Sequence, residues 1–149
     1  MKGEDAKKYS EQSDFGYEKL SREEKDELDR LLKRLDEKKG RWRSKELRDL
    51  YKKMYGDECH YCEIKESEIT VLWKPIYPRQ KGKEIISTRK GLELEHKDGV
   101  KTNNSRKNLS LACPICNIAK SDQFSEEEFK KVGKVIREIW QKRETKTEK

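Results

Sequence analysis

The four cysteines of this chain occur as two C-x-x-C pairs, and this arrangement constrains the fold more than any other feature. The pairs are Cys59-His60-Tyr61-Cys62 and Cys113-Pro114-Ile115-Cys116. They are typical of a tetrahedral zinc site, in which each tight turn directs both of its sulfurs at one ion. The alternatives are two disulfides or four unrelated thiols. Disulfides are disfavoured because residues 1–20 are polar and lack a secretory signal, which predicts a reducing cytoplasm.

The predicted zinc is structural, because four thiolates leave no open coordination position for water. A chain of 149 residues that is 45% charged and only 31% hydrophobic has a modest core, and small cores often need such a staple. Residues 63–112 separate the two pairs, so the segment between them must be an insertion that returns the chain to the site. His60 lies between two ligands and is expected to be an exposed residue of the turn.

Helices are expected before the first cysteine pair and after the second. Ser21 and Glu24 have the spacing of a capping box, and so do Ser125 and Glu128. Apolar side chains then recur at helical spacing. The expected buried positions are Leu28, Leu31, Leu32 and Leu35 in the first helix, Leu47, Leu50, Tyr51 and Met54 in a second helix over 44–55, and Phe129, Val132, Ile136, Ile139 and Trp140 in the last helix.

Short strands are expected between the cysteine pairs. Ile69, Val71 and Trp73 alternate and are followed by Ile85-Ile86, which predicts an inserted hairpin. Leucines alternating with glutamates over 92–95 predict a half-buried strand, and a loop over 97–107 leads to a second strand. The chain is therefore predicted to be of the α+β class, with a flexible arm over 1–19, a helical region over 20–56, a core over 57–123, a helix over 124–141 and a disordered tail over 142–149.

The segment LELEHKDG…KNLSLACPICNIAKSD resembles the HNH endonuclease superfamily. The small ββα-metal core of that family carries an acidic residue followed by His, a middle Asn, and a final His or Asn after the second cysteine pair. This sequence has Glu95-His96, then Asn108, then Asn117, which corresponds to the H-N-N form. The resemblance covers roughly residues 57–123. It implies a treble-clef-like core stapled by the four-cysteine zinc site.

The resemblance also implies roles for individual residues. His96 is the general base that takes a proton from the water attacking phosphorus. Glu95 and Asn117 offer oxygens to one catalytic Mg²⁺ or Mn²⁺. Asn108 ties down the loop and orients the base, and Lys120 contacts a phosphate near the start of the helix that carries it. The implied activity is metal-dependent hydrolysis of DNA phosphodiester bonds.

The identity of the carboxylate ligand is open at this point. Glu95 stands where the family commonly has Asp and is longer by one methylene. Glu93, two residues earlier on the same strand face, and Asp98 in the loop are rival ligands.

The charge of the chain agrees with a polyanionic partner. Lys and Arg number 37 against 30 Asp and Glu, a net charge of +7, and the pI is about 9.1. No apolar run is long enough to span a membrane. Basic residues cluster between the first two expected helices, at Lys38, Lys39, Arg41, Arg43, Lys45 and Arg48.

Two other functions are considered beside the nuclease. One is a zinc-stapled nucleic-acid-binding module without turnover, and the other is a structural partner in a larger nucleoprotein assembly. As a nuclease, one such centre cuts one strand, so cutting both strands would take two copies, as in a homodimer, or a second encounter. The expected setting is the cytoplasm of a bacterial, archaeal or phage-infected cell.

Overall fold

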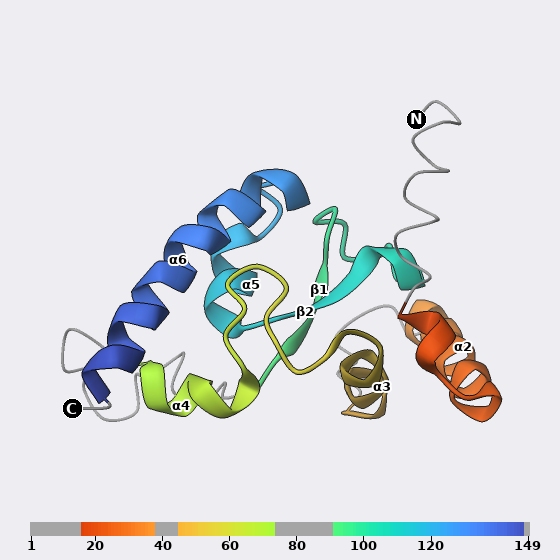
Figure 1. The fold of residues 1–149 in the computed structure, drawn as a ribbon. Helices are drawn as coiled ribbons and strands as arrows, with labels where there is room; N and C mark the ends of the chain where they lie inside the picture. The colour runs from red at the N-terminus through yellow and green to blue at the C-terminus, as the bar shows by residue number, and fades with distance from the viewer. Residues whose placement is uncertain (1–15, 38–44, 74–90, 148–149) are drawn as a thin grey trace, which may run out of the picture. The chain divides into compact units, whose positions relative to one another are not determined.

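The computed structural model describes residues 16–37, 45–73 and 91–147 (Figure 1). The chain divides into two compact units, each described here by itself. The first comprises Met1–Gly56 with Leu94–Leu111, and the second comprises Asp57–Glu93 with Ala112–Lys149.

The first unit is built on two helices, α2 (Arg22–Glu37) and α3 (Lys45–Tyr55), which pack together. The predicted capping box at the start of α2 is confirmed: the Ser21 N–H donates to Glu24 Oε2 at 2.9 Å, and the Glu24 N–H donates to Ser21 Oγ at 3.2 Å. Leu35 is only half-buried, but the other predicted core positions of both helices are buried, namely Leu28, Leu31, Leu32, Leu47, Leu50, Tyr51 and Met54.

A short 3-10 helix, η1 (Tyr17–Lys19), helps to hold the chain just before the second strand. The Tyr17 ring lies 3.7 Å from the Arg106 guanidinium, and Arg106 also pairs with Asp29 at 3.8 Å. The Tyr51 hydroxyl donates to the Arg106 carbonyl at 3.1 Å. Burial raises the pKa of Tyr51, so this phenol stays protonated as a donor. The N-terminal helices therefore hold the end of the loop that follows His96.

Strands β1 (Glu93–His96) and β2 (Leu109–Ala112) form a two-stranded antiparallel sheet, which agrees with a small α+β fold. The expected pattern of leucines inside and glutamates outside is wrong for β1. Leu94 is only half-buried, whereas Glu95 is 3% exposed. The Ser110 hydroxyl of β2 donates to Glu95 Oε2 at 3.0 Å, and this partner offsets part of the cost of burying a carboxylate.

In the second unit, residues 69–72 form the short helix α4 (Ile69–Leu72) and not the first strand of a hairpin. Ile69 and Leu72 are buried while Val71 is 51% exposed, which is a helical and not an alternating pattern. The preceding 3-10 helix η2 (Glu66–Glu68) and a hydrogen bond from Arg143 Nη1 to the Leu72 carbonyl, at 2.9 Å, favour the helix. The other half of the predicted hairpin, Ile85-Ile86, lies outside the described residues.

Helix α6 (Glu126–Thr147) closes the second unit. Its predicted capping box is confirmed by hydrogen bonds from the Ser125 N–H to Glu128 Oε1 at 3.0 Å and from the Glu128 N–H to Ser125 Oγ at 3.2 Å. The helix continues to Thr147, beyond the end expected at residue 141. Neither α6 nor any other described helix has the length and apolar character to cross a membrane.

The contact face of α6 is set by Gly133. A Cβ at this position would lie 2.3 Å from the Tyr61 carbonyl oxygen, so the helix rests directly on the backbone of the first C-x-x-C turn. The Phe129 ring packs edge-on against the Tyr61 ring, with 5.1 Å between the ring centroids. This contact turns Val132 and Ile139 outward, where both are exposed, contrary to the expected buried face.

We expect Gly133→Ala to destabilise the protein. Alanine ordinarily stabilises a helix interior by about 1 kcal/mol relative to glycine. Here the added methyl would overlap the Tyr61 backbone, and overpacking costs roughly 1–3 kcal/mol. The measurement is chemical unfolding of the zinc-loaded protein. Val135→Ala, at a position 58% exposed on the same helix, is the control and should change stability by less than about 0.5 kcal/mol. A Gly133→Ala protein more stable than the parent would contradict this packing.

Candidate functional site

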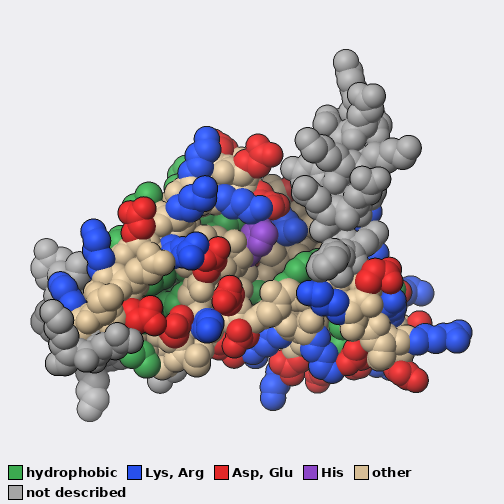
Figure 2. Space-filling model, in the orientation of Figure 1, with side chains coloured by type: hydrophobic (Ala, Val, Ile, Leu, Met, Phe, Trp, Pro, Cys, Tyr) green, Lys and Arg blue, Asp and Glu red, His purple; other side chains and the backbone are tan. Residues whose placement is uncertain are grey.

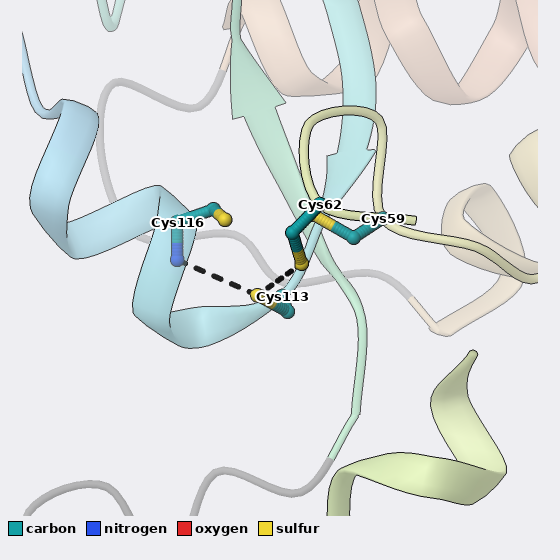
Figure 3. Close-up of side chains that lie close together, drawn as sticks. All are labelled: Cys59, Cys62, Cys113 and Cys116. Carbon is teal, nitrogen blue, oxygen red and sulfur yellow. Dashed lines mark hydrogen bonds between the residues drawn. The ribbon is translucent and has the colours of Figure 1, made fainter. Parts of the chain in front are cut away.

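The four cysteine sulfurs form one buried cluster (Figure 3). Cys59 and Cys62 come from the turn beneath α6, and Cys113 and Cys116 come from the start of α5 (Pro114–Lys120). All four sulfurs lie within 4.8 Å of one another, and those of Cys62 and Cys113 are 3.7 Å apart. Sulfurs about 2.3 Å from a tetrahedral zinc would be roughly 3.8 Å apart. The cluster can therefore hold a metal ion and is consistent with a structural zinc.

Local hydrogen bonds shape both turns. Cys113 caps α5 by accepting the Cys116 N–H at 3.4 Å, and Pro114 at the first helical position suits this start. In the other turn the Cys59 N–H donates to the Ile64 carbonyl at 2.9 Å. A hydrogen bond from Cys113 lowers the pKa of Cys59, whereas hydrogen bonding to the same thiol raises that of Cys116. A metal ion bound here would take the place of these thiol protons.

His60 occupies the first turn without joining the sulfur cluster. Its Nε2 lies 3.2 Å from Glu126 Oε1 at the start of α6, and Lys130 pairs with the same carboxylate at 3.2 Å. His60 therefore links the turn to α6, and its side chain is partly exposed.

In the first unit, His96 ends β1 and is oriented by a loop side chain. Its Nε2 lies 2.8 Å from Oδ1 of Asn104. An amide oxygen can only accept, so Nε2 carries the ring proton. In the neutral ring the lone pair is then on Nδ1, which is the atom able to take a proton from water.

The loop after His96 is organised around Asp98 and Asn108. Asn108 is buried and accepts the Asp98 N–H at 3.1 Å, and its Nδ2 donates to Asp98 Oδ1 at 2.8 Å and to the Asn103 carbonyl at 2.9 Å. Asp98 also accepts from the Val100 N–H at 2.9 Å and from Asn103 Nδ2 at 2.8 Å. Burial raises the pKa of Asp98, but these hydrogen bonds outweigh it, so its pKa is lowered. Both oxygens of Asp98 serve the loop, which argues against this residue as a metal ligand.

The two carboxylates of β1 have different surroundings. Glu95, in the first unit, is buried against Ser110. Glu93, in the second unit, is half-buried and accepts a hydrogen bond from Nδ2 of Asn117 at 2.9 Å. Because Nδ2 of Asn117 donates to Glu93, its Oδ1 is the atom that it can offer to a cation. The carboxylate in contact with Asn117 is therefore Glu93.

Lys120 ends α5 and is fully buried, with 0% of its surface exposed. The side chain is therefore withdrawn from solvent and packs inside the second unit. The expected contact of Lys120 with a phosphate stays a prediction.

The sequence pattern alone does not single out Asn104 or Ser110. Asn103 and Asn104 are adjacent and chemically identical, and only the folded loop decides which one faces His96. Ser110 could have been suspected from its place in a strand paired with Glu95, had the register of the sheet been known.

The basic cluster between the first two helices is only partly described. Residues 38–44 lie outside the described part of the chain, and Lys45 and Arg48 belong to α3. On the face drawn in Figure 2, basic and acidic side chains of the described residues are interspersed.

Comparison with protein-family models gives no match, and comparison with curated proteins gives none either. One solved structure similar to this chain is the rare-cutting HNH restriction endonuclease PacI, at 32% sequence identity and a TM-score of 0.45. The similarity covers 58% of this chain and 55% of that chain, so the match spans about half of PacI. What this chain does is therefore inferred from its own residues.

We expect about one tightly bound zinc per chain by elemental analysis. Cys113→Ser should lose the metal and the fold together, because the ligands are buried and the binding free energy is also folding free energy. Circular dichroism and metal content measure the two effects. Ser105→Ala, an exposed residue of the His96 loop, is the control and should keep both. A Cys113→Ser protein that stays folded without metal would refute the structural role.

Proposed function

We propose that this chain is a metal-dependent HNH-type endonuclease that hydrolyses phosphodiester bonds in DNA. The observation that carries the proposal is the orientation of His96. Its ring is held through Nε2, so that Nδ1 is the basic nitrogen, at the start of a loop tied together by Asn108. The Glu95-His96, Asn108 and Asn117 pattern of the sequence supports the same assignment.

The reaction needs one proton acceptor and one site for negative charge. Nδ1 of His96 takes a proton from water while the water oxygen forms a bond to phosphorus. The bond from phosphorus to the 3′ oxygen breaks, and that oxygen takes a proton from solvent. An imidazole suits this task because its ordinary pKa lies near neutrality.

The oxygen donors for a catalytic cation are Asn117 and a carboxylate of β1. The sequence pattern favours Glu95, and the hydrogen bond to Asn117 favours Glu93. Carboxylate and amide oxygens are suitable for Mg²⁺ or Mn²⁺, which bind few protein groups and keep several waters. Such a cation, when bound, stabilises charge on the phosphate and on the leaving oxygen.

The four-cysteine cluster has a separate, structural role as a zinc site. One catalytic centre cuts one strand, so a single chain nicks DNA and a homodimer would be needed for concerted cutting of both strands. The net charge of +7 supports DNA as the polyanionic partner. The reduced cysteines that this zinc site needs fit a cytoplasmic setting.

The test is the relaxation of supercoiled plasmid in the presence of Mg²⁺ or Mn²⁺. We expect nicked circles to form, and we expect His96→Ala to slow nicking by about 10²–10⁴-fold because the general base is lost. The chain has only two histidines. His60→Gln is therefore the matched control, since His60 pairs with Glu126 outside the proposed reaction. Nicking that is unchanged in His96→Ala would mean contamination or another site.

The alternative of a binding module without turnover has a distinct outcome in the same assay. Such a module would bind DNA in a gel-shift experiment and would leave the plasmid supercoiled with either cation. Binding without nicking by the zinc-loaded protein would therefore favour the module over the enzyme.

The carboxylate ligand can be identified by comparing Glu93→Gln with Glu95→Gln. Because Glu93 contacts Asn117, we expect Glu93→Gln to raise the Mg²⁺ concentration needed for half-maximal nicking more than Glu95→Gln does. Replacing one carboxylate by an amide removes one charge but keeps the shape of the side chain. In Glu95→Gln the new amide oxygen can still accept from Ser110. The opposite order would restore Glu95 as the ligand.

A further inference from the structure

We propose that Asn104 is a positioning residue that fixes both the tautomer and the orientation of the His96 ring. The proposal rests on the proposed function, because it concerns the base of that reaction. Nothing in the sequence pattern assigns a role to Asn104, since it lies outside the acid-His, middle Asn and final Asn positions.

The contact itself is short and has a direction. Asn104 Oδ1 lies 2.8 Å from His96 Nε2 in a part-buried site, so the ring donates and the amide accepts. With the proton held on Nε2, the lone pair is on Nδ1. A rotated ring, or a ring with its proton on Nδ1, would present the wrong atom to water.

Asn104 can act in this way because the loop before it is fixed. Asn108 Nδ2 donates to the carbonyl of Asn103, the residue next to Asn104, at 2.9 Å. Asn103 Nδ2 in turn donates to Asp98 Oδ2 at 2.8 Å. The residue before Asn104 is thus held by two groups of the loop, Asn108 through its backbone and Asp98 through its side chain. We expect this to restrict the amide to one orientation toward His96.

The neighbouring groups have other roles. The Asn108 side chain bonds to Asp98 and to the Asn103 carbonyl, so it organises the loop, whereas Asn104 contacts the ring. The charge of His96 also lowers the pKa of Asp98, but it contributes less than the hydrogen bonds of the loop do. The oxygens of Asp98 accept from the loop donors Val100, Asn103 and Asn108, whereas the ring donates its hydrogen bond to Asn104.

The experiment compares three variants of the full zinc-loaded chain. Asn104→Ala removes the acceptor, Asn104→Asp keeps an acceptor, and Ser105→Ala changes the exposed neighbour of Asn104, whose side chain makes no cap hydrogen bond to the following turn. One readout is the pair of imidazole nitrogen chemical shifts of His96 at about pH 8, where an ordinary histidine is neutral. The other readout is kcat and KM for plasmid nicking.

The wild-type ring should carry its proton on Nε2, and Asn104→Ala should shift the nitrogen signals toward a mixture of tautomers. Its kcat should fall by about ten- to a hundredfold with KM within about twofold, because substrate binding is kept and only the base is misplaced. Asn104→Asp should restore the nitrogen signals and most of kcat, and Ser105→Ala should leave the nitrogen signals unchanged.

Two results would overturn the proposal: a wild-type ring with its proton on Nδ1, or an Asn104→Ala protein with unchanged nitrogen signals and unchanged kcat. Failure of the proposed function looks different. If the wild-type chain nicks no DNA, the nuclease assignment fails, and with it any catalytic role for Asn104, whatever the ring signals show. If nicking depends on His96 but not on Asn104, only the positioning role fails.

Discussion

The cluster of four sulfurs is the constraint on which the second unit depends. It joins two turns that are far apart in the sequence, and each turn then carries a further contact. Tyr61 of the first turn receives α6 at Gly133, and His60 links the same turn to Glu126. The second turn starts α5, where the Asn117 N–H donates to the Cys113 carbonyl at 2.9 Å. The cysteines therefore also determine where Asn117 lies.

In the first unit the comparable element is the loop between the strands, which is held by hydrogen bonds and not by a metal. Its centre is the Asp98 carboxylate, which accepts from Val100, Asn103 and Asn108. Its far end is held at Arg106 by groups from the N-terminal helices. Those helices lie outside the segment that resembles the HNH core. In the structure these helices support the loop between β1 and β2.

The features that could be predicted from the sequence are those with a local signal. The cysteine pairs, both capping boxes and the buried face of α3 depend on spacing along the chain, and the structure contains all of them. The features that could not be predicted depend on distant partners. Residues 69–72 became a helix because α6 and Arg143 stabilise it, and Glu95 is buried because Ser110 lies opposite. The burial of Lys120 and the contact of Asn104 with His96 likewise depend on the folded protein around them.

The proposed function assigns two metal ions to two different kinds of donor in this chain. Soft thiolates select zinc, whereas carboxylate and amide oxygens suit magnesium or manganese, so two different ions can bind without competing for one set of ligands. A closed set of four thiolates has no open position for water, so the proposed reaction uses His96 and the oxygen donors instead. A chelator acts on both ions. Loss of activity with chelator alone therefore does not distinguish unfolding from loss of the catalytic cation. Substitutions such as His96→Ala leave the sulfurs intact, so they separate the two effects.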